Sequence, residues 1–325
     1  MKYLYSLLIS FISLCVLWFV LVYSQIGNST QSSKWLYEAY ELKETSAEKI
    51  TGNKIVIVSG SNSLFGFNSK KLENHWNIPV TNNAVHAGLG LQYILNKSQK
   101  VLNRGDIVIL PIEYDFYQSD GKPSGTYSDY ILSRDVMYFQ NLSLIDKFMV
   151  ISRLSVNRLH KGLIFHFNNK LPPTKGVYGV QNINSYGDQI NIEVEKMTKR
   201  EFTVLNTLSP GLISTPEISS DFIQTMDKYI DWAKNNDVCI IAMPPNYMFF
   251  NEYKEKKYME FLSNIKSFYD FKGVPFLGNP SEYMFDKKFY FNTIYHLNDD
   301  GVQKRSLQVI NDIGKDPRSH CISNK

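Results

Sequence analysis

An apolar run at the N-terminus constrains this chain more than any other feature. Residues 4–23 read LYSLLISFISLCVLWFVLVY and carry no charged side chain. At a rise of about 1.5 Å per residue, a helix of this length crosses the roughly 30 Å hydrocarbon core of a bilayer. We therefore predict a membrane anchor over residues 1–24, with residues 4–23 inside the bilayer.

A cleaved signal peptide is the alternative interpretation of the same run. Signal peptides usually have an apolar core of about 7–15 residues, followed by a small-x-small cleavage site. The run here is longer, and the sequence that follows, Val22-Tyr23-Ser24-Gln25, matches such a site poorly. Lys2 precedes the run, and the positive-inside tendency then places the rest of the chain outside the cytoplasm. The predicted location is a single-pass membrane anchor with an extracytoplasmic body, periplasmic or on the outer face.

Composition indicates that this body is folded and has little affinity for nucleic acid. The 325 residues are 43% hydrophobic and 20% charged, which excludes a disordered protein. The net charge is only +4 and no Lys/Arg run is present, so we expect no nucleic-acid partner. The cysteines Cys15, Cys239 and Cys321 have neither metal-binding nor redox spacing, and a Cys239–Cys321 disulfide is left open. No metal and no cofactor are predicted.

Short apolar segments alternate with amphipathic ones along the body of the chain. Continuous apolar runs predict strands at 54–58, 78–85, 106–112, 238–243 and 274–277. Helical periodicity predicts helices at 35–50, 89–103, 129–159, 219–235, 253–268 and 299–313. This alternation is typical of a parallel sheet covered on both faces. We predict a linker and stalk helix over 25–50, then an α/β domain of three layers (α/β/α) over 51–325 with an irregular insertion around 161–216.

The first predicted strand runs directly into Ser59-Gly60-Ser61-Asn62-Ser63. Glycine permits a tight turn, and a serine at the start of the next helix lies beside free backbone N–H groups that can stabilise an oxyanion. The glycines that a dinucleotide fingerprint, a P-loop or a G-x-S-x-G elbow requires are missing. A turn without chemistry is the alternative for this segment.

A second candidate segment, Tyr295-His296-Leu297-Asn298-Asp299-Asp300-Gly301, precedes the last predicted helix. His296 can reach the first strand because the loops at the carboxyl ends of a parallel sheet lie together. A hydrogen-bonded structural histidine is the alternative. His86 ends the second predicted strand, where lining a site and simple packing are equally expected.

The segments SGSNSLFG and YHLNDDG together resemble the SGNH (GDSL-type) hydrolase superfamily. Within it, the layout is similar to the membrane-anchored extracytoplasmic branch of alginate O-acetylation and teichoic-acid D-alanylation proteins. The resemblance implies Ser61 as the nucleophile and His296 as the general base. It also implies an oxyanion hole formed by Ser61, Gly88 and Asn83. Further candidates for lining the site are Asn62, His86, Glu113 and Tyr114.

The sequence departs from the family pattern at two positions. Glu113 follows the third strand where the family usually has an asparagine, and Thr293 occupies the position of the usual orienting aspartate. Asn292, one residue earlier, is the predicted replacement, because an amide oxygen can accept the histidine Nδ1–H. An amide stabilises an imidazolium less well than a carboxylate does, so recruitment of Glu113 or Asp286, or loss of activity, are alternatives.

The predicted function is that of a serine acyltransferase or esterase acting on a cell-surface or exported polysaccharide through a Ser-His acyl-enzyme. The resemblance also implies a multi-span membrane acyltransferase as partner. An inactive SGNH-like subunit that binds or scaffolds the polysaccharide is the alternative, with Thr293 as its main support. An anchored α/β domain of unrelated function is the third. The enzyme hypothesis expects Ser61 Oγ within about 2.6–3.2 Å of His296, or somewhat further before substrate binds.

Overall fold

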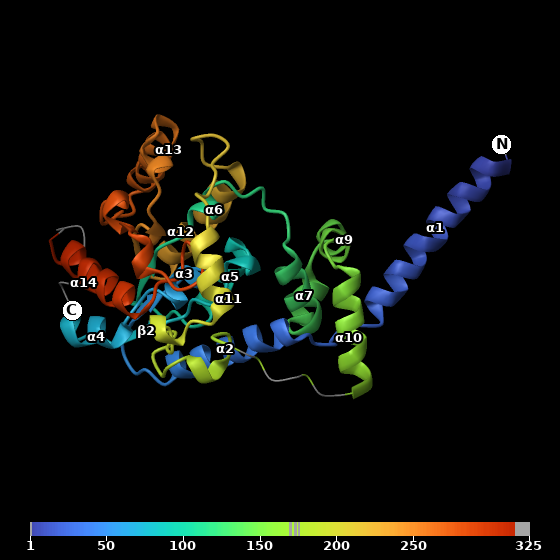
Figure 1. Ribbon diagram of the computed structural model, residues 1–325, viewed down its shortest axis with the longest axis horizontal. Helices are drawn as coiled ribbons and strands as arrows, with labels where there is room; N and C mark the ends of the chain where they lie inside the picture. The colour runs from blue at the N-terminus through green and yellow to red at the C-terminus, as the bar shows by residue number, and fades with distance from the viewer. Residues whose placement is uncertain (1, 169–170, 172–173, 175, 316–325) are drawn as a thin grey trace. The chain divides into compact units, whose positions relative to one another are not determined.

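The computed structural model describes residues 2–168, 171, 174 and 176–315 (Figure 1). The chain forms two compact units. The helical unit contains Met1–Glu38 and Lys122–Lys175, and the α/β unit contains Ala39–Gly121 and Gly176–Lys325. Helix α2 (Gln31–Glu48) contributes residues to both, and confirms the helix predicted at 35–50.

The helical unit begins with α1 (Lys2–Tyr23), which is long and apolar enough to cross a membrane, as a membrane anchor or a signal sequence would be. The single helix predicted at 129–159 is wrong, because this region forms four short helices. The starts of the first three are set by polar side chains: Ser124, Asp135 and Ser143 each accept a backbone N–H from the next turn. The four are α7 (Gly125–Ser133), α8 (Val136–Asn141), α9 (Leu144–Ser152) and α10 (Val156–Asn168).

A buried polar cluster joins the residues after α1 to α7 and α10. The Arg158 guanidinium donates to Asp129 Oδ1 at 2.8 Å and to Gln25 Oε1 at 2.9 Å. Asp129 Oδ2 accepts a hydrogen bond from Thr30 Oγ1 at 2.5 Å. Val22, near the end of α1, is fully buried. The end of the apolar helix and the segment that follows it are therefore part of the folded unit.

The α/β unit is built on a four-stranded parallel sheet, as the alternating pattern predicted. Its strands are β1 (Ile55–Ile57), β2 (Val80–Asn82), β3 (Ile107–Leu110) and β4 (Cys239–Ala242), in the order β2-β1-β3-β4. The fifth strand predicted at 274–277 is only a single parallel bridge between Ala242 and Phe276, since Pro275 has no N–H to extend the ladder. A separate parallel pair contains β5 (Tyr247–Met248) and β6 (Met284–Phe285).

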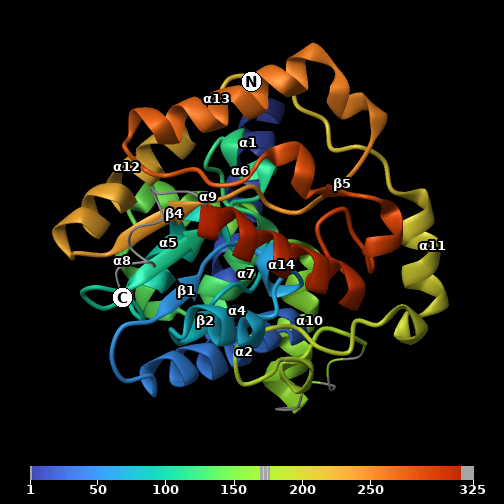
Figure 2. The same ribbon diagram turned by 90° about the vertical axis from the view of Figure 1, so that its left-hand side faces the viewer.

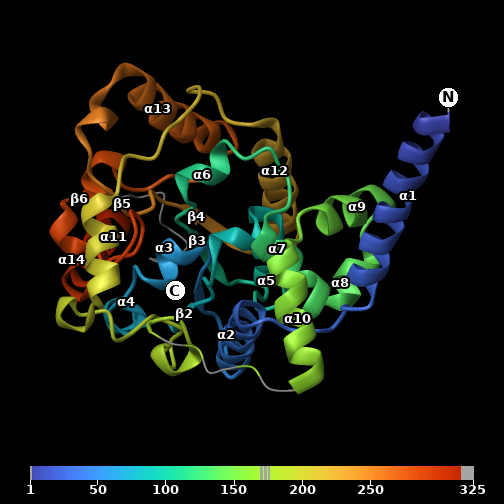
Figure 3. The same cartoon turned by 45° about the vertical axis from the view of Figure 1, so that its right-hand side comes forward.

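Helices cover both faces of this sheet (Figures 2 and 3). Alternate strand residues such as Ile57 and Ile109 pack with Leu72 of α4 (Ser69–Trp76) and Val309 of α14 (Asp299–Lys315) on one face. On the other face lie α5 (Leu91–Gln99) and α12 (Ser220–Asn235), joined by a 2.8 Å hydrogen bond between the Ser98 and Tyr229 hydroxyls. The remaining bounds are α3 (Ser61–Leu64), α6 (Tyr114–Tyr117), α11 (Lys199–Thr207) and α13 (Lys256–Phe271).

The strand order defines where a ligand site belongs. The chain passes from β1 to β2 on one side and then crosses from β2 to β3 on the other side of β1, so the carboxyl ends of β1 and β3 flank a topological switch point. The segment after β1 is the Ser61 turn, and the segment after β3 contains Glu113.

Candidate active site at the carboxyl edge of the sheet

The Ser61 turn lies against the segments that follow the two neighbouring strands. Ser61 is the first residue of α3 and is half-buried. Gly60 has no room for a side chain, because a Cβ there would lie 2.6 Å from Ala87 Cα and would collide with the Glu113 carboxylate. Residues that follow β1, β2 and β3 therefore meet at Gly60, which explains why glycine precedes the serine.

Glu113 holds the backbone of this turn. Its carboxylate is buried and accepts hydrogen bonds from the Gly60 N–H at 3.0 Å and the Asn62 N–H at 3.1 Å. Burial raises the pKa of Glu113, while these hydrogen bonds act in the opposite direction. Both Glu113 carboxylate oxygens accept backbone N–H groups of the turn, so Glu113 positions the Ser61 turn and does not take the place of the oxyanion donor that an asparagine would supply.

Asn62 and Arg305 fasten the other side of the turn. Asn62 Nδ2 donates to Pro111 O at 2.9 Å, and Arg305 of α14 donates to Asn62 O at 3.0 Å and to Asn62 Oδ1 at 3.1 Å. Arg305 also bonds to Asn246 Oδ1, and Asn246 Nδ2 donates to Tyr295 O at 2.5 Å. Fully buried Arg305 thus links the Ser61 turn, through Asn246, to the residue before His296.

Arg305, Asn246 and Tyr295 were missed by the sequence analysis. The available signal was a charged residue among Val302, Ser306 and Val309 on the buried side of α14. Such a position is unusual for an arginine unless its charge and donors are satisfied.

His296 is held by a side-chain amide. Its Nδ1 lies 2.7 Å from Asn292 Oδ1, and Asn292 Nδ2 donates to the Tyr178 hydroxyl at 3.1 Å. With the amide NH₂ group directed to Tyr178, the amide oxygen faces the ring and can accept an Nδ1–H. An imidazole protonated at Nδ1 keeps its lone pair on Nε2, which is the tautomer that a general base needs. The Thr293 hydroxyl accepts the His296 backbone N–H at 3.0 Å, so it shapes the loop.

Phe65 connects His296 to the Ser61 turn. The two rings stack with centroids 4.0 Å apart and planes within 4°, and the Phe65 N–H donates to Ser61 O at 3.0 Å. Burial, and secondarily the charge of His86, lower the pKa of His296 to about 3. Within the described part of the chain, Ser61 Oγ and His296 share no direct hydrogen bond. Such bonds are often long before substrate binds.

The predicted oxyanion residues lie on the segment after β2. The Gly88 N–H donates to His86 Nδ1 at 2.9 Å, so this donor is engaged within its own loop. Burial lowers the pKa of His86. Asn83 is 2% exposed, and its side-chain oxygen has no hydrogen-bond partner among the described residues. Asn83 is therefore a buried amide with unused hydrogen-bonding capacity.

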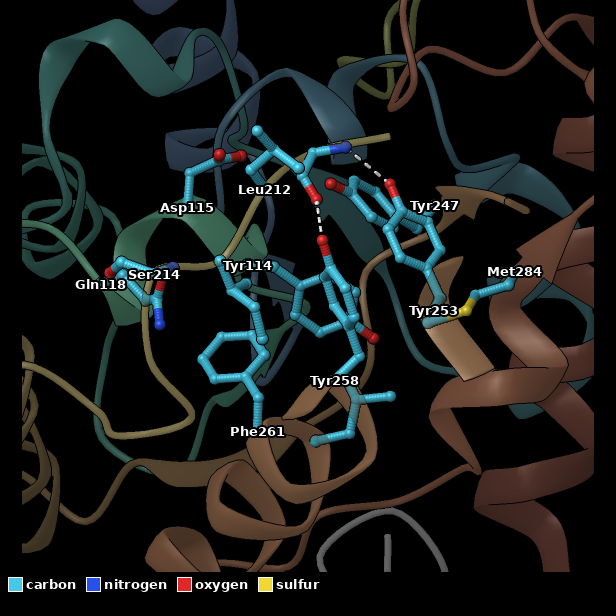
Figure 4. Close-up of a pocket in the computed structure, with 13 residues that line it drawn as sticks. Tyr114, Asp115, Gln118, Leu212, Ser214, Tyr247, Tyr253, Tyr258, Phe261 and Met284 are labelled. Atoms are coloured by element: carbon cyan, nitrogen blue, oxygen red, sulfur yellow. Dashed lines mark hydrogen bonds between the residues drawn. The ribbon is translucent and has the colours of Figure 1, made fainter. Parts of the chain in front are cut away.

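Asp286 and Tyr114, two further residues named by the sequence analysis, do not contact Ser61 or His296 through any hydrogen bond among the described residues. Asp286 accepts the Lys288 N–H at 3.0 Å and so caps a short turn. Tyr114 lines a cavity of about 280 Å³ that adjoins the site (Figure 4). The Tyr114 N–H donates to the Tyr295 hydroxyl at 3.0 Å, and these two residues directly follow Glu113 and precede His296.

Among the described residues, no group of three or more His, Cys, Asp or Glu side chains could hold a metal ion. The Cys239–Cys321 pair involves Cys321, which lies outside the described residues.

Comparison with known proteins identifies no relative of this chain. The chain matches no protein-family model, and no curated protein matches it. The structure defines an α/β protein with a four-stranded parallel sheet and an N-terminal apolar helix. Within that class no family is identified.

Proposed function

We propose that this chain is a membrane-anchored, extracytoplasmic serine acyltransferase or esterase of the SGNH type that acts on a cell-surface or exported polysaccharide. Ser61 carries the acyl group and His296 is the general base. The observation that carries this proposal is the contact of His296 Nδ1 with Asn292 Oδ1 at 2.7 Å, beside the Ser61 turn. A membrane acyltransferase with several spans is the proposed donor partner.

The proposed reaction has two steps. His296 Nε2 takes the Ser61 hydroxyl proton while Ser61 Oγ attacks the acyl carbonyl, and the proton then goes to the departing oxygen or sulfur. In the second step a sugar hydroxyl, or water in an esterase, gives its proton to Nε2 and takes the acyl group from Ser61. Ser61 regains its proton from His296.

Tyr178 answers the main objection to an asparagine in this role. In a serine protease the change of the orienting aspartate to asparagine costs about ten-thousand-fold, because the ring adopts the wrong tautomer. Here the amide NH₂ group donates to the Tyr178 hydroxyl, so the amide oxygen is directed to His296. This arrangement supports an active site despite Thr293 in the aspartate position.

The membrane anchor is supported by the way α1 ends. Val22 is fully buried, and Gln25 accepts a hydrogen bond from Arg158. Cleavage in this region would remove or expose residues that belong to the folded helical unit. We therefore favour an anchor that stays attached, with Lys2 on the cytoplasmic side.

The test is covalent labelling of the full chain in a neutral detergent. We expect p-nitrophenyl acetate to give a burst of p-nitrophenol and a mass gain of one acetyl group on Ser61, both absent from Ser61→Ala. Ser63→Ala is the matched control, since it removes a hydroxyl from the same turn and should keep both signals. Equal labelling of wild type and Ser61→Ala would exclude Ser61 as the nucleophile.

One observation favours an inactive polysaccharide-binding or scaffolding subunit as the second candidate. The Gly88 N–H, the predicted oxyanion donor, is already bonded to His86. An inactive subunit would show no burst in wild type, Ser61→Ala or Ser63→Ala, yet would still bind the polysaccharide.

A further inference from the structure

The α/β unit contains an aromatic cavity to which neither Ser61 nor His296 contributes. We propose that this cavity, of about 280 Å³, binds a small organic cation of the substituted-ammonium class. Its walls include Tyr114, Tyr247, Tyr253, Tyr258 and Phe261, with the Asp115 carboxylate at one side (Figure 4). Below it is called the tyrosine cavity.

The charge of the tyrosine cavity favours a cation. Asp115 is the one charged side chain among the described residues that line it, and none of them is Lys, Arg or His. Burial is the main cause that raises the pKa of Tyr253 to about 12, and the negative charge of Asp115 adds to it. Buried Arg305 is not a lining residue, and its guanidinium is bound to Asn62 and Asn246. An anionic ligand would therefore meet repulsion from Asp115 without a compensating cation.

The rings surround the cavity from several directions. The Tyr114 and Tyr247 planes meet at 86° with centroids 5.2 Å apart, and those of Tyr253 and Tyr258 meet at 61° with centroids 5.1 Å apart. Tyr114 and Phe261 meet at 67°. A cation is attracted to every ring face within about 6 Å, as in the aromatic cages that bind quaternary ammonium groups. The Tyr247 and Tyr253 rings are stacked at 25° with centroids 5.0 Å apart, while the other ring pairs meet at steep angles. Most of the lining therefore offers no single flat surface on which a sugar could stack.

Most of the polar groups that line the cavity are engaged by the protein. The Tyr253 hydroxyl accepts the Gly211 N–H at 2.8 Å, and the Tyr258 hydroxyl donates to Gly211 O at 3.1 Å (Figure 4). A Cβ at Gly211 would collide with the Tyr247 hydroxyl. The Gln118 amide bonds to Ser214 N and to Thr215 O. Three recognition elements are left for a ligand: the ring faces, the Asp115 carboxylate and the Tyr114 hydroxyl, which has no hydrogen-bond partner among the described residues.

The size of the tyrosine cavity limits the ligand to a small head group. Pockets for drug-sized ligands measure about 300–1,000 Å³, and this cavity lies just below that range. A trimethylammonium group with a short substituent fits this description, whereas a polymer chain does not.

The experiment is calorimetric titration of the full chain in a neutral, non-ionic detergent with choline and with 3,3-dimethylbutan-1-ol. The alcohol has the same shape as choline but carries no charge. We expect saturable binding of choline and binding of the alcohol that is weaker by about tenfold or more, since the ring faces and Asp115 both act on the charge. No acyl donor is present, so the result is independent of whether Ser61 is acylated.

Three variants locate the binding. Asp115→Asn should weaken choline binding about tenfold and leave binding of the neutral alcohol unchanged. Tyr258→Leu should weaken choline binding strongly, whereas Tyr258→Phe, which keeps the ring, should retain most of it. The thermal unfolding midpoint of each variant establishes that it is folded. Equal affinity for both ligands, binding unaffected by Asp115→Asn, or binding of a neutral monosaccharide in place of choline would overturn the proposal.

Discussion

The strand residues of the α/β unit are buried, whereas helices α8–α10 of the helical unit carry large apolar side chains on their outer surface. Leu144, Ile145 and Phe148 of α9 are more than half exposed, and so are Met137, Val156 and Phe167. The Phe148 ring lies 6.1 Å from Phe19 of α1, so this exposed surface continues from the apolar helix. The α/β unit folds around its own core, while the helical unit exposes large apolar side chains of the kind that mark a surface for a protein partner or a membrane.

Both units also contain buried charged groups. In the helical unit the buried Arg158–Asp129 pair joins three segments of the fold. In the α/β unit, buried charges such as Glu113 and Arg305 lie around the Ser61 turn and contact it through backbone and amide groups. The buried charges around Arg158 stabilise the helical unit, whereas Glu113 and Arg305 position the Ser61 turn. Four experiments test these differences between the two units.

The largest effect is expected at the site. Asn292→Leu removes the acceptor for the His296 Nδ1–H and should reduce the rate of Ser61 acylation by up to about ten-thousand-fold. Tyr178→Phe frees the amide to turn and should cause a smaller loss in the same direction. Asn292→Asp is the control and should retain or raise the rate. Stopped-flow release of p-nitrophenol measures all three, and an unchanged rate in Asn292→Leu would exclude His296 as the base.

Removal of one partner from the buried pair of the helical unit should destabilise the fold. Arg158→Ala leaves Asp129 buried and uncompensated, which should cost about 3–5 kcal/mol of the free energy of unfolding. Arg104→Ala is the matched control, because its pair with Asp237 is exposed and should contribute at most about 1 kcal/mol. Urea unfolding followed by fluorescence gives both values. Similar losses in the two variants would contradict the comparison.

The pH dependence should distinguish His296 from an ordinary exposed histidine. The pKa of His296 is lowered to about 3, so the ring stays neutral and can accept a proton until the pH approaches that value. Acylation should therefore show no loss near pH 6.5, the ordinary value for histidine. The unfolded chain binds a proton at this histidine below about pH 6.5 and the folded one does not, so His296 lowers stability as the pH falls below that value. A rate profile that falls with a pKa near 6.5 would contradict this assignment.

The smallest change in stability is expected on the exposed surface of α9. Phe148→Trp should alter the free energy of unfolding by less than about 0.5 kcal/mol, because the position is exposed. In bilayers that contain brominated lipids, the added tryptophan should be quenched. Phe271→Trp, at an 85% exposed position in the α/β unit, is the control and should not be quenched. Equal quenching at the two positions would remove the distinction between the surfaces of the two units.

Local patterns in the sequence predicted much of the fold. The apolar run over residues 4–23 and the four parallel strands follow from side-chain burial within one segment, which hydrophobic pattern reports directly. Hydrophobic patterns were less reliable where a single polar side chain or a single missing N–H determines where a helix or strand ends. Asp135 and Ser143 divide the helix predicted at 129–159, and Pro275 prevents the strand predicted at 274–277.

The sequence by itself determined that a serine turn and a histidine loop lie at the carboxyl edge of a parallel sheet, and it indicated Asn292 beside that histidine. Only the tertiary structure decided the amide orientation, because Tyr178 lies 114 positions away along the chain. The same holds for Arg305, which contacts Asn62 across 243 positions, and for the tyrosine cavity, whose rings come from separate elements. Contacts of this kind depend on side-chain geometry between distant segments, which no local periodicity encodes.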